Sequence, residues 1–330
     1  MTTTHVVSDH PTVGTKNDLP KVGIVGAGQV GSALAYATII RGVVPRIAVY
    51  DIDEKRTLAQ VADLAHGTVY AGPEVTGGAD PEVLRDSDIV IITSGAPQRP
   101  GQTRLDLADI NAKIIGDIIP KVLNVAPDAL IVLVTNPCDV LTVVAQKISG
   151  LPNNRIFSTG TSLDTARLRH LIAKRANVSE NNVHAEMAGE HGDSEFALWS
   201  TATIGLVPVK EWIDDNGNRP FTDDVTTQIA QDVAEAAYQV IAGKGSTNYA
   251  IGLSGAYLIE RLLSASHSLM PLSSTLDDYY GISGVALSVP TLVNNQGIIR
   301  AVTVPMSKAE RGALETSAAT LHSILHSIGY

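Results

Sequence analysis

The feature that most constrains the fold is a regular alternation, in the first half of the chain, of short apolar segments with longer amphipathic ones. The apolar segments are KVGIVGAG, RIAVYD, DIVIITSG and ALIVLVTN, and helix-like stretches such as VGSALAYATIIRG and DEKRTLAQVADLAHG lie between them. Strands that are apolar on both faces are typical of a parallel sheet that helices cover on both sides. The sequence therefore predicts an α/β fold with a doubly wound parallel sheet.

The second half of the chain follows a less regular order. It contains a helix-like segment LDTARLRHLIAKRAN, short strand-like segments around VHAEM and FALWS, a long helical region over residues 223–266 and a last helix from Ser307. No internal repeat or low-complexity linker divides the chain. We expect a flexible tail over residues 1–20, an α/β domain over residues 21–160, and an α+β domain over residues 161–330 packed closely against it.

The composition excludes several classes of protein. A chain of 330 residues with 44% hydrophobic content can bury a substantial core. Its net charge of -10 and its scattered basic residues form no basic stripe, so a nucleic acid partner is not expected. The single cysteine, Cys138, rules out an intrachain disulfide, and no apolar run reaches the roughly 18 residues of a membrane-spanning helix. Because residues 1–20 also lack the pattern of a signal peptide, we expect a cytoplasmic protein.

The segment VGIVGAGQVG has the spacing of a dinucleotide-binding loop. Gly26, Gly28 and Gly31 follow an apolar strand and precede an alanine-rich helix. Glycines allow a tight turn and a close approach to a pyrophosphate, which the N-terminus of the following helix attracts. Asp51 ends the next strand, 20 residues after Gly31, where an acid typically binds the ribose hydroxyls and repels a 2′-phosphate. We therefore predict a Rossmann-type domain over residues 21–160 that binds NAD rather than NADP; the alternative is a plain glycine turn beside an exposed aspartate.

Other catalytic motifs are incomplete. His322 and His326 stand four residues apart on the last predicted helix, but no third ligand accompanies them, so no metal site is predicted. Gly243 and Lys244 are followed by glycine instead of the serine or threonine of a phosphate loop, and no G-x-S-x-G motif occurs. These observations argue against metalloenzymes, NTPases and serine hydrolases.

Three further regions carry the polar residues that a reaction on a small acid needs. They are APQRPGQTRLDL, then VTNPCDV with TSLDTARLR, and finally GEHGDSE. Because several unrelated short motifs occur in the family's order, the chain resembles the lactate and malate dehydrogenase family from Lys21 to the last helix. The resemblance implies NAD-dependent hydride transfer to an α-keto acid, with residues 161–330 as the substrate domain.

The chemistry of that reaction gives each polar residue a candidate role. Reduction of a ketone leaves negative charge on its oxygen, so a proton donor with a pKa near neutrality is needed, and His191 is the candidate. In the resemblance, Asp164 fixes and stabilises the imidazolium, while Arg167, on nearly the same helical face, grips the substrate carboxylate. Arg104 lies in a proline- and glycine-bearing loop suited to closing over the substrate, and Asn136 ends an apolar strand where it would contact substrate or cofactor.

Each of these residues also has a plain structural interpretation. A histidine between glycines is often a turn residue, Asp164 could cap its helix, and Arg104 or Arg167 could form solvated ion pairs. A non-catalytic NAD-binding protein is therefore an alternative. It would be expected to lack at least one of His191, Asp164, Arg167 and Arg104, and all four are present.

The residue that selects the substrate is predicted to be Gln98. In the resemblance, this position carries glutamine in the lactate branch and arginine in the malate branch. Arginine would pair with a second carboxylate but would be an unpaired cation beside the methyl group of pyruvate, so Gln98 favours pyruvate and L-lactate. Arg99 is adjacent and keeps malate dehydrogenase open as the alternative. Thr247 matches a threonine beside the small end of the substrate, and Ile251 a residue against the nicotinamide; both are also ordinary helix residues.

The resemblance further implies a set of cofactor contacts and an effector site. The predicted cofactor contacts are Gly26, Gly28, Val30, Gly31, Asp51, Gly95, Ala96, Thr135, Asn136 and Ile251. Arg169 and His184 match positions that bind fructose 1,6-bisphosphate on a symmetry axis between subunits, which implies a homotetramer. The alternative is that Arg169 is solvated and His184 packs on a strand. Cys138 lies close to Asn136, but we expect it to pack as a small apolar residue without a catalytic role.

Overall fold

A nine-stranded sheet runs through the centre of the molecule. The computed structural model describes residues 19–97 and 104–330, with the side chain of Arg104 outside the described part. The strands of this sheet lie in the order β14-β13-β12-β6-β5-β4-β1-β2-β3. Their bounds are β1 Lys21–Val25, β2 Arg46–Tyr50, β3 Glu74–Gly78, β4 Ile89–Ile92, β5 Leu130–Leu133, β6 Ile156–Ser158, β12 Ser268–Thr275, β13 Ala286–Asn294 and β14 Gly297–Ala301.

The six strands from the first half of the chain are parallel. β1 pairs with β2 on one side and with β4 on the other, and β3, β5 and β6 extend the sheet in both directions. Almost every residue of β1, β2, β4 and β5 is buried, as expected for strands that helices cover on both faces. The predicted α/β class with a doubly wound parallel sheet is confirmed.

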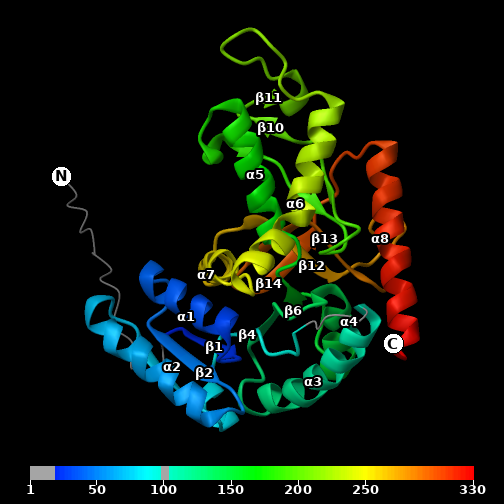
Figure 1. Cartoon of the computed structure of the whole chain (residues 1–330). Helices are drawn as coiled ribbons and strands as arrows, with labels where there is room; N and C mark the ends of the chain where they lie inside the picture. Colours follow the sequence, from blue (N-terminus) through cyan, green and yellow to red (C-terminus); the bar gives the residue numbers. More distant parts are fainter. Residues whose placement is uncertain (1–18, 98–103) are drawn as a thin grey trace, which may run out of the picture.

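Helices cover both faces of the sheet (Figure 1). The helices are α1 Gln29–Arg41, α2 Glu54–Gly67, α3 Arg104–Val125, α4 Cys138–Ser149, α5 Ser162–Ala176, α6 Asp223–Lys244, α7 Tyr249–Leu262 and α8 Lys308–Ser327. Apolar residues of α3, α4 and α8 form one core with the sheet, and those of α1 and α7, with α2 at the edge, form a second core on the opposite face. Helices from both halves of the chain thus share each layer.

The second half of the chain completes the sheet of the first half. β12 lies antiparallel to β6 with Ser273 opposite Ser158, and β13 and β14 follow as antiparallel neighbours. α8 runs down one side of the molecule and contacts α3, α4 and β13 (Figure 1). The two halves are therefore joined by backbone pairing as well as by packed helices.

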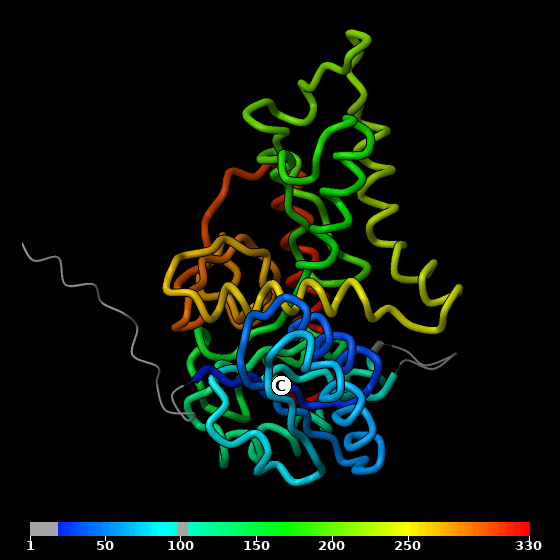
Figure 2. The backbone as a smooth tube through the Cα atoms, turned by 90° about the vertical axis from the view of Figure 1, so that its left-hand side faces the viewer, coloured from blue at the N-terminus to red at the C-terminus, as the bar shows by residue number. Residues whose placement is uncertain are grey.

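A third, smaller core lies beyond this sheet. It is formed by α5, α6 and two small sheets, whose strands are β7 Val183–His184, β8 Met187–Ala188, β9 Phe196–Ala197, β10 Thr203–Ile204 and β11 Val207–Pro208. Four short 3-10 helices join elements in the described chain: η1 Thr68–Tyr70, η2 Pro81–Leu84, η3 Glu180–Asn182 and η4 Val209–Glu211. Figures 1 and 2 show this part projecting away from the parallel strands.

Three details differ from or refine the sequence expectations. The helical region predicted over residues 223–266 is two helices, because the chain turns at Gly245 with a φ of 85°, a conformation that favours glycine. β3 was not predicted from the sequence. The last helix starts next to Ser307, as predicted, and Ser307 caps α8 in a capping box with Glu310. Among the described residues, every helix is too short or too polar to span a bilayer.

Candidate active site

The glycine loop between β1 and α1 exposes main-chain atoms without side chains at the edge of a cavity. Gly26 has a φ of 117°, a conformation that side chains disfavour. A Cβ atom on Gly31 would lie 1.9 Å from the carbonyl oxygen of Gly26, so only glycine fits there. A Cβ atom on Gly28 would meet no other atom within 4 Å, and Gly28 caps the N-terminus of α1. Gly26 and Gly31 therefore shape the loop, whereas Gly28 leaves room for a ligand at a helix N-terminus.

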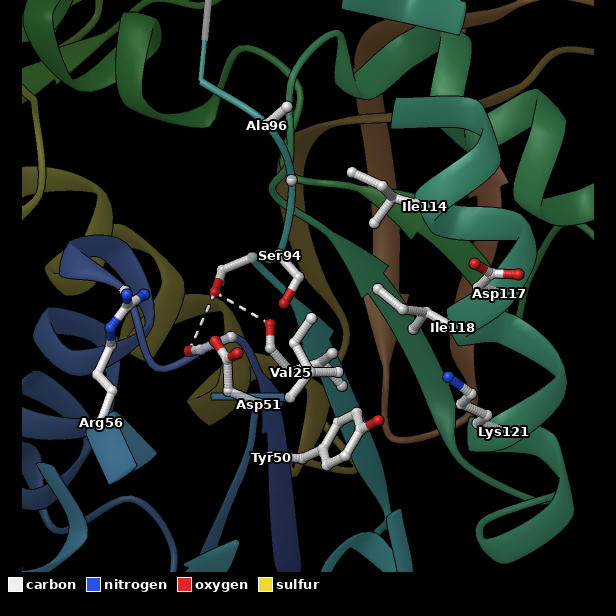
Figure 3. A pocket seen from close by; sticks show the side chains of 15 residues that line it. Val25, Tyr50, Asp51, Arg56, Ser94, Ala96, Ile114, Asp117, Ile118 and Lys121 are labelled. Atoms are coloured by element: carbon white, nitrogen blue, oxygen red, sulfur yellow. Dashed lines mark hydrogen bonds between the residues drawn. The ribbon is translucent and has the colours of Figure 1, made fainter. Parts of the chain in front are cut away.

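The cavity above this loop has a volume of about 500 Å³. It is lined by Val25, Gly26, Gly28, Tyr50, Asp51, Ile52, Arg56, Thr93, Ser94, Gly95, Ala96, Ile114, Asp117, Ile118 and Lys121. Figure 3 shows Asp51 at the end of β2 on one side and Asp117 and Lys121 of α3 on the other. It lies at the carboxyl ends of β1, β2 and β4, where doubly wound sheets bind their ligands.

The carboxylate of Asp51 is held in place by backbone donors. Its Oδ2 accepts a hydrogen bond from the Ala27 amide at 2.8 Å, and its Oδ1 accepts one from the Asp53 amide at 3.1 Å. Each carboxylate oxygen keeps a further lone pair that can accept a hydroxyl hydrogen. A cavity with an open helix N-terminus and a fixed acid at its wall fits a dinucleotide with free ribose hydroxyls.

The predicted cofactor residues divide into two groups. Gly26, Gly28, Asp51, Gly95 and Ala96 line the cavity. The others do not line it: Gly31 packs behind the loop, Thr135 is buried and donates to the Ser94 carbonyl at 2.8 Å, Asn136 faces a second cavity, and Val30 and Ile251 line neither cavity.

Asn111, a residue that the sequence analysis missed, joins the two cavities. Its side chain is fully buried in α3; Oδ1 accepts from the Ala96 amide at 2.8 Å and Nδ2 donates to the Asn136 carbonyl at 2.7 Å. One amide group therefore sets the spacing between the ends of β4 and β5. A polar residue within the apolar side of an amphipathic helix is the signal that would have singled it out.

The second cavity is smaller, about 160 Å³, and collects most of the predicted catalytic residues. It is lined by Leu107, Asn136, Pro137, Asp164, Arg167, His191, Gly192, Asp193, Glu195, Ala234, Ala237, Tyr238 and Ile241. These residues come from α3, the loop between β5 and α4, α5, α6 and the loop before β9. His191, Asp164, Arg167 and Asn136 therefore meet in one place, although they are far apart in the chain.

Asp164 stands between the two predicted cations. Its Oδ2 lies 2.7 Å from Nδ1 of His191, and its Oδ1 lies 2.6 Å from a terminal nitrogen of Arg167. Burial alone would raise the pKa of Asp164, but His191 and Arg167 lower it below its ordinary value. Burial alone would lower the pKa of His191, but the charge and hydrogen bond of Asp164 raise it well above 6.5. The pair thus holds a proton on His191 with Asp164 ionised.

Hydrogen bonds to two other elements, β13 and α4, hold the loop that carries His191. Gly189 and Ser288 of β13 exchange two backbone hydrogen bonds of 2.9 Å. The backbone amide of His191 donates to Oδ2 of Asp139 at 2.8 Å, and Asp139 is a buried residue in the first turn of α4. Burial raises the pKa of Asp139 to about 6. Asp139 was not predicted from the sequence, although it lies three residues after Asn136.

A second carboxylate, that of Glu195, lies close to the same imidazole. Its Oε2 lies 3.8 Å from Nδ1 of His191, and its side chain is only 2% exposed. Oxygen and nitrogen atoms of Asp164, His191 and Glu195 lie within 4.8 Å of one another, a spacing that a metal ion could bridge. The guanidinium of Arg167 already supplies the positive charge beside Asp164, which disfavours a metal cation there.

Of the remaining predicted substrate residues, the structure describes the side chain of Thr247. Gln98 and Arg99 lie outside the described residues, and Arg104 is the first residue of α3, with its side chain outside the described part. Thr247 lies between α6 and α7 and lines neither cavity; in the same region Tyr238 and Ile241 face the second cavity instead. The hydroxyl of Tyr238 donates to Asp193 at 3.3 Å.

The two predicted effector residues are neighbours on the surface. Nε of Arg169 donates at 2.9 Å to the carbonyl of Ala185, the residue that follows His184. A terminal nitrogen of Arg169 lies 3.6 Å from Glu186. His184 is exposed on β7.

Cys138 is buried at the start of α4. Burial raises the pKa of its thiol to about 12, so it is neither a nucleophile nor a metal ligand at neutral pH. This environment agrees with the packing role expected for it.

Two family models together cover most of the chain. Residues 20–158 match the NAD binding domain of lactate/malate dehydrogenases, and residues 161–328 match the alpha/beta C-terminal domain of the same family. The first match confirms the prediction of NAD as the cofactor.

Individual relatives are similar over nearly their whole length. The chain is 49% identical over 311 residues to an L-lactate dehydrogenase of Bifidobacterium animalis subsp. lactis, with 94% of this chain and 97% of the relative covered. It is 43% identical over 312 residues to an L-lactate dehydrogenase of Kosmotoga olearia, with 93% and 96% covered. A solved structure of a minor L-lactate dehydrogenase from Enterococcus mundtii superimposes with a TM-score of 0.89 at 34% identity, with 94% of this chain and 98% of that chain covered.

Proposed function

Because the chain belongs to the lactate/malate dehydrogenase family, we propose that it is an NAD-dependent L-lactate dehydrogenase, which interconverts pyruvate and L-lactate. The observation that carries the proposal is the buried contact of His191 with Asp164, beside Arg167. This arrangement offers a proton donor and a carboxylate-binding cation in one cavity. The names of the relatives support lactate over malate as the hydroxy acid.

In pyruvate reduction, His191 delivers the proton. NADH supplies the hydride that reduces the carbonyl carbon of pyruvate. The oxygen gains negative charge as this happens, and Nε2 of His191 gives it a proton, so that neutral His191, NAD⁺ and L-lactate remain. Asp164 keeps its own charge throughout and holds Nδ1 of His191 in the donating tautomer. Lactate oxidation runs the same proton transfer in reverse.

The remaining residues orient the substrate. The planar guanidinium of Arg167 can grip the pyruvate carboxylate with two parallel hydrogen bonds, while Asp164 neutralises part of its charge. Asn136 lines the same cavity and has an amide that can donate to the substrate oxygen. We assign Arg104, at the start of α3, the polarisation of the carbonyl and the exclusion of water.

The choice between pyruvate and oxaloacetate is assigned to Gln98. The test follows NADH absorbance with pyruvate and, in parallel, with oxaloacetate. We expect the native chain to prefer pyruvate, and Gln98→Arg to raise oxaloacetate turnover at the expense of pyruvate, because arginine pairs with the second carboxylate. An unchanged preference in the variant would remove Gln98 from this role. A preference of the native chain for oxaloacetate would favour malate dehydrogenase and implicate Arg99, whereas no turnover of either acid would favour a non-catalytic NAD-binding protein.

We further propose that Arg169 and His184 bind fructose 1,6-bisphosphate as an activator. Their closeness on one surface supports a shared phosphate site. Glu186 neutralises Arg169 in the absence of a phosphate, and an incoming phosphate would have to take its place. The bisphosphate should lower the apparent KM for pyruvate, more strongly at about pH 6 than at about pH 8, because a protonated imidazole attracts phosphate. Titrations without effect at both pH values would refute the site.

Self-association to a homotetramer is the third part of the proposal. α1 and α7 pack together and expose large apolar side chains on their outer faces: Tyr36, Ile40, Leu253 and Tyr257. Exposed apolar side chains on two packed helices favour burial against a second copy. Light scattering should give a mass near four times the 34.7 kDa of one chain, and a monomeric mass would refute the assembly.

A further inference from the structure

The second cavity contains a buried carboxylate to which the proposed reaction assigns no step. Glu195 immediately precedes β9, and its side chain is 2% exposed. Its Oε2 has no hydrogen-bond partner among the described residues. The nearest cation is the imidazole of His191, whose Nδ1 lies 3.8 Å away. That distance is too long for a hydrogen bond but short enough for a strong electrostatic interaction.

The groups around His191 explain why Glu195 is left without a partner. The Nδ1 proton of His191 is directed at Asp164, 2.7 Å away, and Arg167 of α5 is also paired with Asp164. The other titratable groups that face the imidazole from neighbouring elements are Cys138 and Asp139 of α4, Glu190 and Asp193 of its own loop, and Tyr238 of α6. Among the described side chains, Asp164 therefore engages both His191 and Arg167.

A carboxylate in this position changes its charge near neutral pH. Taking an ionised carboxylate out of water without a hydrogen-bond donor is costly, so the protonated form is favoured. Burial raises the pKa of Glu195 to about 7 against the opposing effect of the neighbouring His191, and the negative charge of Asp164 acts in the same direction as burial. Glu195 is thus a neutral acid below that pH and an anion above it.

We propose that Glu195 is a positioning residue for the proton of His191, whose proton affinity it raises when it becomes ionised. The inference rests on the proposed function, because it concerns the proton that His191 exchanges with the substrate. Below neutral pH, neutral Glu195 leaves the imidazolium with Asp164 alone as its counter-ion. Above neutral pH, the Glu195 carboxylate adds a second counter-ion and keeps His191 protonated.

The sign of the effect is the same for both directions of the reaction. Pyruvate reduction needs protonated His191 and fails above the pKa of His191, whereas lactate oxidation needs neutral His191 and fails below it. An anionic Glu195 raises that pKa. In a plot of kcat/KM against pH, reduction therefore falls off on its basic limb, and oxidation on its acidic limb, at higher pH with Glu195 than without it.

The test is the pH dependence of kcat/KM for Glu195→Gln. Glutamine keeps the shape of the side chain but cannot become an anion. We expect both limbs to move down by about 0.7 pH unit or more, the size of a Coulomb interaction across ~4 Å at the dielectric constant of water. Limbs that stay in place while the rates fall at every pH would overturn the inference and leave Glu195 a structural role.

A second readout does not depend on turnover. Diethyl pyrocarbonate reacts with neutral imidazole, so its rate of reaction with His191 against pH gives the pKa of His191 in the protein without substrate. Mass spectrometry of the peptide that carries His191 measures that rate. The rate profile of Glu195→Gln should move to lower pH by the same amount as the limbs, even if neither pyruvate nor oxaloacetate is turned over, so the inference and the proposed function fail separately.

Two further variants serve as controls. Glu195→Asp keeps an ionisable group on a shorter side chain and should bring the limbs back toward their native positions. Glu315→Gln removes one negative charge from an exposed position on α8, a helix that contributes no residue to the second cavity. It should leave the limbs in place; a shift as large as that of Glu195→Gln would attribute the effect to net charge and overturn the assignment.

Discussion

The cavity at the glycine loop and the smaller cavity around His191 differ in what forms their walls. The larger one is shaped by backbone: a glycine loop, a helix N-terminus and strand ends, with Asp51 as its fixed acid. The smaller one is shaped by charged side chains that contact each other, Asp164 with His191 and Arg167. A backbone site needs particular backbone conformations, whereas a side-chain site needs several elements to be placed correctly at once. We therefore expect changes at the first cavity to alter cofactor binding or the stability of the loop, and changes at the second to alter mainly the reaction of the substrate.

The largest effect is expected at the centre of the side-chain cavity. Asp164→Asn keeps the size of the side chain but removes the charge that holds the proton on His191. We expect kcat for pyruvate reduction to fall by about 10²–10⁴-fold, the usual contribution of an oriented proton donor. The affinity for NADH, measured by fluorescence titration, should change less than about threefold. Asp164 lines the second cavity, whereas the glycine loop and Asp51 line the first. An equal loss of NADH affinity would show that the two cavities are not separable.

An intermediate effect is expected in the glycine loop, where two alanine substitutions should behave differently. In Gly31→Ala, the new Cβ would lie 1.9 Å from the Gly26 carbonyl oxygen, and we expect the free energy of unfolding to fall by about 1–3 kcal/mol. In Gly28→Ala, the Cβ enters open space, so Tm should stay within about 2 °C while the Kd for NADH rises about tenfold.

Thermal unfolding and NADH titration of the two loop variants distinguish the outcomes. If Gly28→Ala destabilises the chain as much as Gly31→Ala, the space above Gly28 is not available to a ligand. If Gly28→Ala changes neither Tm nor the Kd for NADH, the cofactor does not approach the backbone at this point. Either result would contradict the different roles that we assign to the two glycines, in which Gly31 shapes the loop and Gly28 leaves space for the cofactor.

The smallest effect is expected for Cys138, which borders the side-chain cavity without belonging to it. Its side chain is 1% exposed and the pKa of its thiol is raised to about 12. Iodoacetamide at about pH 8 should leave the native chain unmodified and active, because only an accessible thiolate reacts. Mass spectrometry after denaturation should show one reactive thiol. Modification of the folded chain with loss of activity would mean that the side-chain cavity opens far more than its geometry indicates.

The parallel core of the fold was readable from the sequence because its signals are local. KVGIV, RIAVY and their counterparts are apolar and β-branched, so each predicted a buried strand correctly. β3 was missed because its segment, EVTGG, contains two glycines and an exposed acid, as an edge strand can. The long helical region predicted over residues 223–266 is divided into α6 and α7, because Gly245 provides a turn that helical periodicity alone does not reveal.

The site was predictable only in part, for a related reason. Chemistry pointed to His191, and the family resemblance supplied Asp164 and Arg167 as its neighbours. Asp139 and Glu195 were not predicted, because nothing near them in the sequence says that they flank the imidazole. Which carboxylates end up within 4 Å of one histidine depends on how α4, α5 and the loop before β9 pack, and that is a property of the folded chain.

The pairing of β6 with β12 also affects how the chain is made. β6 ends at Ser158, and the strand that covers its free edge begins only at Ser268. During translation at about 5–20 residues per second, that edge would stay open for roughly 5–20 seconds. An uncovered buried-type strand invites pairing with other chains. We therefore expect a chain that is truncated between β6 and β12 to aggregate more readily than the full chain.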